Sequence, residues 1–355
     1  MSTESSLSRQ ERPRPLAPRA SLVDVALRRA PLVGARLAED GARGFVSPVE
    51  ARVHVGIAYG DLLAEELAYL ASPRSLGKDL KVAARGLLAA ALGQGGGHEE
   101  PRPFVVSAHV DNVSLEEALA GILARPRDSR ARLVHFVHPH ALNTAFTDAA
   151  LREQLARADL VLPDGIGLRL AAQVLGVSLR HNLNGTDLLP VLCARAAAEG
   201  IPLVLVGAAE GIAEACRERL LAATPGLRIP IAHHGYLDEA ASRALAKRIG
   251  ELGRVIVLVG MGTPLQERWA HTHLAALPEC TALTVGGLFD FFSGRMPRAP
   301  LALRELGLEW AFRLAQEPRR LAKRYLLGNP VFLTLATLQR LGVGHQPTQG
   351  LSATS

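Results

Sequence analysis

The sequence predicts an α/β fold built on a doubly wound, mainly parallel sheet. Between residues 104 and 300, short apolar runs rich in valine and leucine alternate with longer stretches of amphipathic, helical periodicity. Before and after these limits, mainly helical patterns are found. Short strands between helices are typical of Rossmann-like sheets, which carry helices on both faces. We therefore expect one such sheet, a helical extension before it and a basic helical arm after it.

Each apolar run is an expected strand and each amphipathic stretch an expected helix. The strands are expected at Phe104–His109, Leu133–His138, Leu160–Pro163, Leu203–Val206, Ile229–His233, Val255–Val259 and Ala282–Val285. The helices are expected at Asp148–Arg157, Gly167–Leu175, Asp187–Ala198, Glu210–Ala222, Glu239–Leu252 and Leu265–Ala275. A capping box, Ser114 with Glu117, begins one more helix that runs to Leu123.

Composition divides the rest of the chain. Residues 1–20 are polar and rich in proline and arginine, which predicts a disordered head, and a disordered tail is expected at 342–355. Residues 21–94 predict a helical extension with a membrane-surface or partner-docking role. Glycines and prolines at 95–103 predict a linker to the α/β domain, residues 104–300. The basic amphipathic arm is expected at 301–341.

Charge and composition limit the function and the location. The formal net charge is +6 and the pI is about 9.6, which favours an anionic partner such as a nucleotide, a lipid phosphate, a membrane surface or a nucleic acid. No secretory signal and no run of eighteen apolar residues is found, so we expect a cytoplasmic protein, peripheral on the inner face of the membrane. The three cysteines, Cys193, Cys216 and Cys280, match no metal-binding spacing and predict small buried thiols.

The carboxyl ends of the strands are the place to look for a site, because ligands of open α/β sheets bind there. Asp164 is the only carboxylate among these strand ends, and burial beside glycine would suit it as a general base. An N-cap aspartate for the next helix is an equal alternative. The other candidates at strand ends are His138, Gly165 and Gly207.

Two strands end in glycines that predict phosphate binding. Gly260 with Gly262 follows one strand, and Gly286 with Gly287 follows the other. Glycine allows close approach of the backbone, and a following helix offers free N–H groups. The first loop lacks the third glycine of a dinucleotide fingerprint and the lysine of a Walker motif, and an ordinary tight turn remains the alternative. Further candidates near these loops are Gln266, Glu267 and Asp290.

Two other groups of residues are candidates. Gly185, Thr186 and Asp187 open a helix, where they act either as its cap or as contacts to a substrate hydroxyl. The histidine pairs 138/140 and 271/273 have no cysteine or carboxylate to complete a metal site, so no metal is expected.

The arm carries basic residues among leucines and aromatics, typical of a membrane surface or of a solvated face. Its basic residues are Arg304, Arg313, Arg319, Arg320, Lys323, Arg324 and Arg340.

Six blocks of sequence, in order, resemble the WecG/TagA/CpsF glycosyltransferase family (glycosyltransferase family 26). They cover roughly residues 105–335 and read VDNVSLEEAL, ARADLVLPDGIGLRLAAQVLG, NGTDLLPVLC, VLVGMGTPLQERW, TVGGLFDFFSGRMPRAP and LGLEWAFRLAQEPRRLAKRYLLGNPVFL. The resemblance implies an inverting enzyme that needs no metal or other cofactor. It implies transfer from a UDP-sugar to an undecaprenyl-diphosphate-linked saccharide in cell-surface or exopolysaccharide synthesis, without nucleic acid as a partner. Homo-oligomer formation is left open.

The same resemblance assigns roles. It implies that Asp164 is the base and that the Gly-x-Gly-x-Pro-x-Gln-Glu loop lines the nucleotide site. It also implies that arm cations, by position Arg313, Arg320, Lys323 and Arg324, close over the diphosphate and contact the membrane. Where family members often carry Thr and Asn, this chain has Phe136 and His138. The imidazole of His138 can hydrogen-bond a sugar and is a second catalytic candidate, whereas Phe136 cannot. The donor sugar is therefore left open among N-acetylmannosamine, mannosaminuronate and glucose types.

Two other functions compete with this hypothesis. Residues 46–93 are weakly similar to the trailing segment of polyprenyl-phosphate sugar-phosphate transferases, whose catalytic core is absent. This similarity, together with the altered Phe136/His138 pair, leaves a non-catalytic docking module of a polysaccharide synthesis complex as one alternative. A nucleotide-dependent oxidoreductase is the other, and the missing third glycine argues against it.

Overall fold

The computed structural model describes Val33 and residues 62–73, 75–92, 97–126 and 130–343, and it divides into two units, Met1–Gly93 and Gln94–Ser355. The predicted head, most of residues 21–61 and nearly all of the predicted tail lie outside the described residues. The second unit holds the predicted sheet, and each unit is described by itself.

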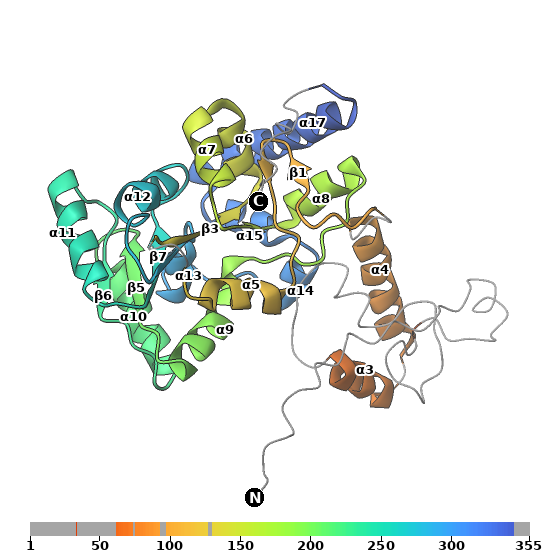
Figure 1. Cartoon of the computed structure of the whole chain (residues 1–355). Coiled ribbons are helices and arrows are strands. Elements are labelled where there is room, and N and C mark those ends of the chain that lie inside the picture. Colours follow the sequence, from red (N-terminus) through yellow and green to blue (C-terminus); the bar gives the residue numbers. More distant parts are fainter. Residues whose placement is uncertain (1–32, 34–61, 74, 93–96, 127–129, 344–355) are drawn as a thin grey trace, which may run out of the picture. The chain divides into compact units, whose positions relative to one another are not determined.

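The sheet of the second unit is parallel throughout (Figure 1). Its order is β4–β3–β8–β7–β5–β6, and every neighbouring pair is parallel. The strands are β3 (Arg132–Val137), β4 (Leu160–Pro163), β5 (Leu203–Gly207), β6 (Ile231–His233), β7 (Val255–Gly260) and β8 (Cys280–Thr284). All their carboxyl ends therefore point to one edge, where a ligand site is expected.

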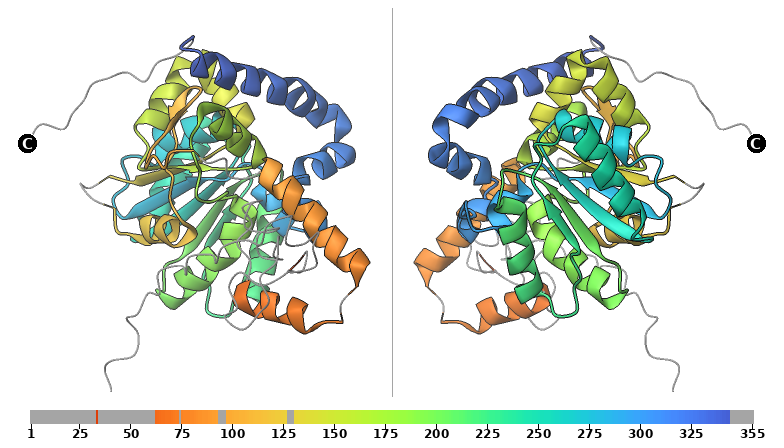
Figure 2. Two further views of the ribbon diagram at one scale, coloured as in Figure 1. Left: turned by 90° about the vertical axis from the view of Figure 1, so that its right-hand side faces the viewer. Right: turned by 90° about the vertical axis from the view of Figure 1, so that its left-hand side faces the viewer.

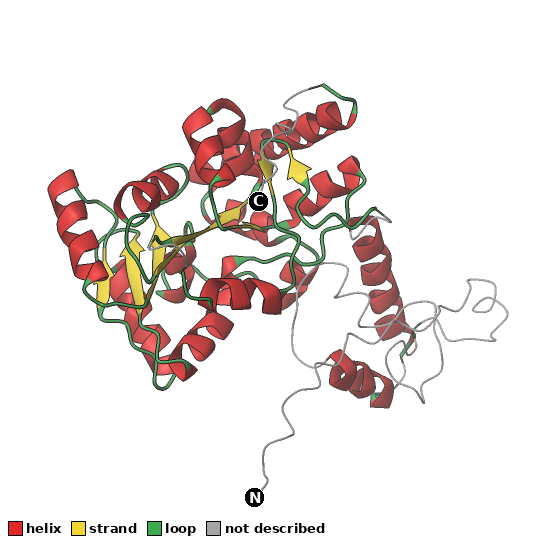
Figure 3. Cartoon of the chain, in the orientation of Figure 1, coloured by secondary structure: helices red, strands yellow, loops and turns green. Residues whose placement is uncertain are grey.

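Helices cover both faces of this sheet, which confirms the doubly wound fold (Figures 2 and 3). One core joins alternate strand residues, such as Val134 and Leu258, to one set of helices. The alternating positions, such as Leu133 and Val257, face the opposite core. The first set is α5 (Leu115–Leu123), α9 (Gly185–Ala198), α10 (Ile212–Ala223) and α13 (Leu288–Phe292). The opposite face carries α11 (Glu239–Gly250) and α12 (Leu265–His273).

A third core, beside β3 and β4, packs helices from both ends of the domain. It contains α6 (Pro139–Thr147), α7 (Ala149–Ala156), α8 (Ile166–Leu175) and α17 (Gly328–Arg340). Phe332 and Ala336 of α17 are fully buried in it. The side chain of Gln339 accepts from the Val106 N–H and donates to the Phe104 carbonyl. The end of the arm is thus part of the folded domain.

Two local expectations were wrong. Phe104–His109 is not one strand but two short antiparallel ones, β1 (Phe104–Val105) and β2 (Ala108–His109). The chain reverses because Val106 takes a left-handed conformation (φ 60°) and the Ser107 N–H bonds the Val105 carbonyl. The arm is also not one continuous helix. It is divided into α14 (Leu301–Glu305), α15 (Glu309–Gln316), α16 (Pro318–Ala322), a π-turn η1 (Lys323–Leu327) and α17.

The predicted linker is held against the α/β domain where it is described. His98 forms a parallel bridge with Val177, and Pro101 accepts from the Asn112 N–H.

The first unit has helices α3 (Leu62–Ala71) and α4 (Leu76–Leu92). Among the described helices, none has both the length and the apolar character that crossing a bilayer requires. The buried thiols were predicted correctly, and burial raises the pKa of all three to about 12.

Candidate active site

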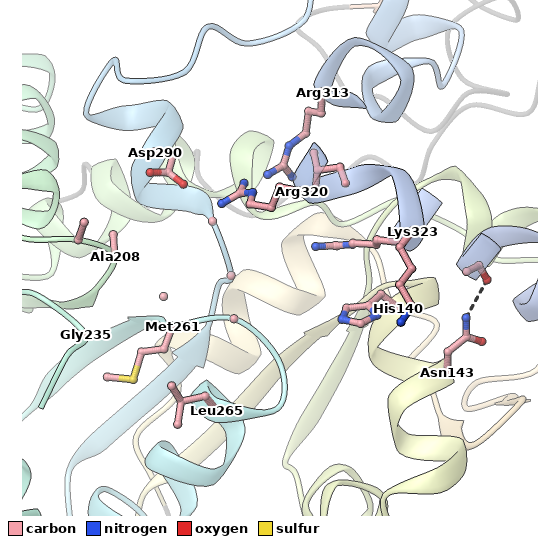
Figure 4. Close-up of a pocket in the computed structure, with 18 of the residues that line it drawn as sticks. His140, Asn143, Ala208, Gly235, Met261, Leu265, Asp290, Arg313, Arg320 and Lys323 are labelled. Atoms are coloured by element: carbon pink, nitrogen blue, oxygen red, sulfur yellow. Dashed lines mark hydrogen bonds between the residues drawn. The ribbon is translucent and has the colours of Figure 1, made fainter. Parts of the chain in front are cut away.

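A cavity of about 880 Å³ opens at the carboxyl ends of β5, β7 and β8 (Figure 4). Glycines from the strand ends form its floor, and cations of the arm point into it from the opposite side. The predicted residues that line it are Gly260, Gly262, Gly286, Gly287, Asp290, Arg313, Arg320, Lys323 and Arg324. Residues far apart in sequence are therefore brought to one place by the sheet and the arm.

The glycine loops are shaped for close approach. A Cβ on Gly260 would lie 2.8 Å from the Gly286 carbonyl oxygen, so only glycine allows the two loops to touch there. Gly262 has φ +80° and no neighbour within 4 Å of a Cβ, so its backbone faces open space in the cavity wall. Gly207 is a packing residue, because its Cβ would lie 2.3 Å from the Gly260 carbonyl.

Gln266 and Glu267 hydrogen-bond these loops on their buried side, and each is 2% exposed. The Gln266 side chain accepts from the Gly286 N–H at 2.9 Å and donates to Glu267 Oε1 at 2.8 Å. Glu267 also accepts from Thr263 Oγ1 at 2.9 Å. One amide thereby joins the β7 loop to the β8 loop. Burial raises the pKa of Glu267, and neither side chain lines the cavity.

Asp164 stands at the end of β4, where its N–H bonds the Val137 carbonyl of β3. Its side chain is partly buried and lies beyond the cavity wall, within the electrostatic reach of Arg313 and Arg324. Loss of hydration raises its pKa to about 6, with Glu309 and Asp187 acting in the same direction and the two arginines opposing it. Gly165 (φ +92°) donates its N–H to Asn182 and turns the chain into α8.

Asp164 does not cap α8. The N-cap position is Gly165, and no side chain bonds the first turn of that helix. A carboxylate held without that structural role, and with a pKa near neutrality, has the properties expected of a general base. This geometry favours the catalytic interpretation of Asp164 over the capping one.

His138 lies at the neighbouring strand end and caps α6. Its Nδ1 accepts from the Ala141 N–H at 3.0 Å, so a proton on the neutral ring is carried by Nε2. Burial and the nearby Arg324 hold the pKa of His138 well below its usual value. The ring is thus a hydrogen-bond donor and not a base. Phe136, two residues earlier, is in the core and 5% exposed.

The structure places Gly185, Thr186 and Asp187 outside the cavity wall. Gly185 packs against Leu288, and Thr186 Oγ1 donates to Asn184. The Asp187 carboxylate pairs with Arg298 at 2.5 Å and with Arg304 at 3.7 Å. Asp290 does line the cavity, where its carboxylate pairs with Arg295 at 3.1 Å.

Sequence reasoning missed several lining residues, among them Asn143, Tyr236 and Arg295. Tyr236 follows the end of β6 by three residues, so a search that continued for one turn beyond each strand end would have found it. In the part of the chain that the structure describes, no group of three His, Cys, Asp or Glu side chains could hold a metal ion.

A sequence model of the "Glycosyl transferase WecG/TagA/CpsF family" matches residues 104–346. The chain belongs to this family. Among curated relatives, the chain is 33% identical over 180 residues to an N-acetylglucosaminyldiphosphoundecaprenol N-acetyl-beta-D-mannosaminyltransferase of Bacillus spizizenii, covering 51% of this chain and 68% of the relative. It is 30% identical over 196 residues to proteins of the same description from Staphylococcus aureus strains, covering 55% and 76%.

Membership of the WecG/TagA/CpsF family makes this chain a glycosyltransferase. The matched region spans the whole sheet and the arm, so the cavity, Asp164 and the arm cations all fall inside it.

Proposed function

We propose that the enzyme transfers an N-acetylmannosamine-type sugar from a UDP-sugar to a saccharide linked to undecaprenyl diphosphate, with inversion at the anomeric carbon. The observation that carries this proposal is a glycine-floored cavity walled by Arg313, Arg320, Lys323 and Arg324, two of whose arginines lie within electrostatic reach of Asp164, a carboxyl with a pKa near neutrality. The acceptor class comes from the relatives, whose names specify N-acetylglucosamine on diphosphoundecaprenol.

The chemistry follows from these groups. The acceptor hydroxyl attacks the anomeric carbon of the donor while the bond from that carbon to the diphosphate oxygen breaks. Asp164 takes the hydroxyl proton, and the bonding electron pair leaves with the diphosphate. Attack opposite the leaving group inverts the configuration. Only an ionised Asp164 can accept the proton, so the reaction needs a pH above its pKa of about 6.

The leaving diphosphate needs positive charge, and the arm supplies it. Arg313, Arg320, Lys323 and Arg324 line the same cavity as the glycine loops. Guanidinium groups bind phosphate oxygens in a two-pronged fashion, and loop N–H groups add further donors. Turnover should therefore survive treatment with EDTA. Loss of activity in EDTA that added Mg²⁺ restores would contradict metal independence while leaving the transferase function intact.

We assign His138 to substrate orientation and leave Asp164 as the base. Two observations support this: the neutral ring of His138 can donate from Nε2, and the residue follows β3, next to the strand that ends at Asp164. The His138 side chain does not itself line the cavity.

The arm also supports an association with a membrane surface. Leu326, Leu327 and Val331 are 57%, 62% and 51% exposed, directly after Lys323 and Arg324. Leu327 and Val331 also line the cavity. Exposed leucines beside lysine and arginine suit an anionic bilayer, where each cation near the surface contributes about 1 kcal/mol. We place the enzyme on the inner, cytoplasmic face of the membrane.

A single assay tests the function. Purified full-length enzyme is supplied with UDP-N-acetylmannosamine and a short-chain lipid-linked N-acetylglucosamine diphosphate. Formation of the disaccharide with release of UDP is the expected result. UDP-glucose and UDP-N-acetylmannosaminuronate, run in parallel, decide the donor. Tight binding of NAD with no binding of UDP would overturn the proposal.

A further inference from the structure

Helix α15 places Arg313 in the cavity, but the hydrophobic core does not hold it there. None of the residues of Glu309–Gln316 is buried. Arg313 nevertheless lines the cavity, with its guanidinium carbon 4.8 Å from the centre of the Phe291 ring and its Nη2 beside Gly287. Because the side chains of this short helix are at most partly buried, polar contacts can decide where its residues are held.

An ionic network supplies such contacts. Arg298 donates from Nη2 to the Asp187 carboxylate at 2.5 Å and from Nε to the Glu309 carboxylate at 3.4 Å. The side chains of Arg298, Asp187 and Glu309 are 24%, 18% and 26% exposed, so water screens them less than it screens a surface pair. A planar guanidinium can hold two carboxylates at once.

Each end of this network belongs to a helix. Asp187 belongs to the first turn of α9, where Asn184 binds both its N–H and its carboxylate, and α9 itself is anchored by buried leucines. Glu309 opens α15 and stands four residues before Arg313, so the two side chains lie on the same face of that helix. A rigid link therefore runs from the core through Arg298 to the helix that carries Arg313.

We propose that Arg298 is a positioning residue, which bridges Asp187 to Glu309 and thereby holds Arg313 at the glycine loops. Asp187, which sequence alone suggested as a substrate contact, becomes the fixed end of this bridge. The inference rests on the proposed function, because it assigns to Arg313 the diphosphate of the donor.

A double-mutant cycle tests the bridge. We compare wild type, Arg298→Gln, Arg313→Gln and the double variant by kcat/KM for sugar transfer and by the Kd for inorganic pyrophosphate. Displacement of a catalytic group by about 1 Å can cost about a hundredfold in rate, so Arg298→Gln is expected to lose about ten- to a hundredfold. If Arg298 acts through Arg313, the double variant loses no more than Arg313→Gln alone.

Controls separate this role from a general effect on stability. Arg243→Gln on α11 removes an arginine whose pair with Glu239 is exposed (73% and 59%), and it should change neither quantity. Arg298→Lys keeps the charge but loses the planar guanidinium that can bind two carboxylates. Its kcat/KM and Kd should lie between those of wild type and Arg298→Gln. If Arg298→Gln does not fold, Glu309→Gln replaces it in the cycle, because it leaves the Arg298–Asp187 pair intact.

The outcomes are distinct. Losses that multiply in the double variant, or an Arg298→Gln variant that melts earlier but retains wild-type kcat/KM and Kd, would overturn the positioning role. A wild type that transfers no sugar from any UDP-sugar would overturn the proposed function instead. The pyrophosphate Kd would then still decide whether Arg298 acts through Arg313, since that measurement needs neither donor nor acceptor.

Discussion

At the scale of single residues, the candidate site contains two side chains whose pKa values differ from their ordinary values. Loss of hydration brings the pKa of Asp164 to about 6, and burial keeps His138 neutral with its proton on Nε2. These two pKa shifts suit the different roles that we propose for the two residues, a proton acceptor for Asp164 and a hydrogen-bond donor for His138.

Asp164→Asn keeps the shape of the side chain and removes its basicity. We expect kcat to fall by about a hundred- to ten-thousandfold, with UDP binding unchanged in calorimetry. The melting temperature at pH 7 should stay the same or rise. A carboxyl whose folded pKa is raised costs stability as the pH rises from its unfolded pKa through its folded pKa, so the full cost is present at pH 7 and asparagine removes it.

The pH profile of the wild type provides the second test of Asp164. The logarithm of kcat/KM should fall as the pH drops through about 6, because the protonated base cannot accept the hydroxyl proton. A profile that stays flat down to pH 5 would show that another group takes the proton.

Gly262→Val should abolish UDP binding by filling the space that the backbone leaves open. Gly226 is a matched control, since it too has a positive φ (+81° against +80°) and no neighbour within 4 Å, but lies outside the cavity wall. Gly226→Val should cost similar stability from backbone strain and leave UDP binding intact. Equal UDP affinity in both variants would place the phosphates elsewhere.

At the scale of elements, the arm divides into two parts with different surroundings. Residues between Arg313 of α15 and Val331 in the first turn of α17 line the cavity, whereas Phe332 and Ala336 of α17 pack into the core. The apolar residues at the junction, Leu326, Leu327 and Val331, remain exposed beside cations. The proposed diphosphate-binding cations and the proposed membrane surface thus lie in one segment.

The double variant Leu327→Ser/Val331→Ser tests the membrane surface without touching the cations. Losing two exposed apolar side chains should weaken binding to anionic liposomes by about tenfold or more, with an unchanged melting temperature. Leu221→Ser, at an exposed leucine (38%) of α10 outside the cavity wall, is the control and should bind liposomes as wild type does. Retained liposome binding in the double variant would move the membrane contact to another part of the chain.

At the scale of the whole molecule, the arm is also part of the hydrophobic core of the α/β domain. Phe332 is fully buried among helices α6, α8 and α17, and the Gln339 side chain binds the backbone of β1 and the turn after it. Removal of the arm therefore exposes a core as well as removing cations, so truncation cannot separate the two roles.

Phe332→Ala should lower the free energy of unfolding by about 3–5 kcal/mol, measured by urea denaturation, while leaving UDP binding intact at low temperature. By the same argument, a chain cut after Pro300 should fail to fold. A soluble, cooperatively folded truncated chain would show that α17 is dispensable to the core.

Much of the fold and part of the site could be predicted from sequence. Apolar runs and amphipathic stretches depend on local periodicity, and glycines at strand ends report the local backbone, so the parallel sheet, Gly260 and Gly286 were found directly. The hairpin at Val106 was missed, because a left-handed valine leaves no signal in a propensity pattern. Asp164 was found as a strand-end carboxylate, but its pKa depends on burial by distant elements.

Which distant side chains meet depends on the tertiary structure. The α/β class, the strand ends at which the cavity opens and the cationic character of the arm follow from local pattern and composition, and could be predicted from sequence. It could not show that Arg298 joins Asp187 to Glu309, that Gln266 joins the two glycine loops, or that α17 enters the core. Contacts of this kind join residues as far apart as Phe104 and Gln339, 235 positions along the chain, and they exist only because sheet order and helix packing bring them together.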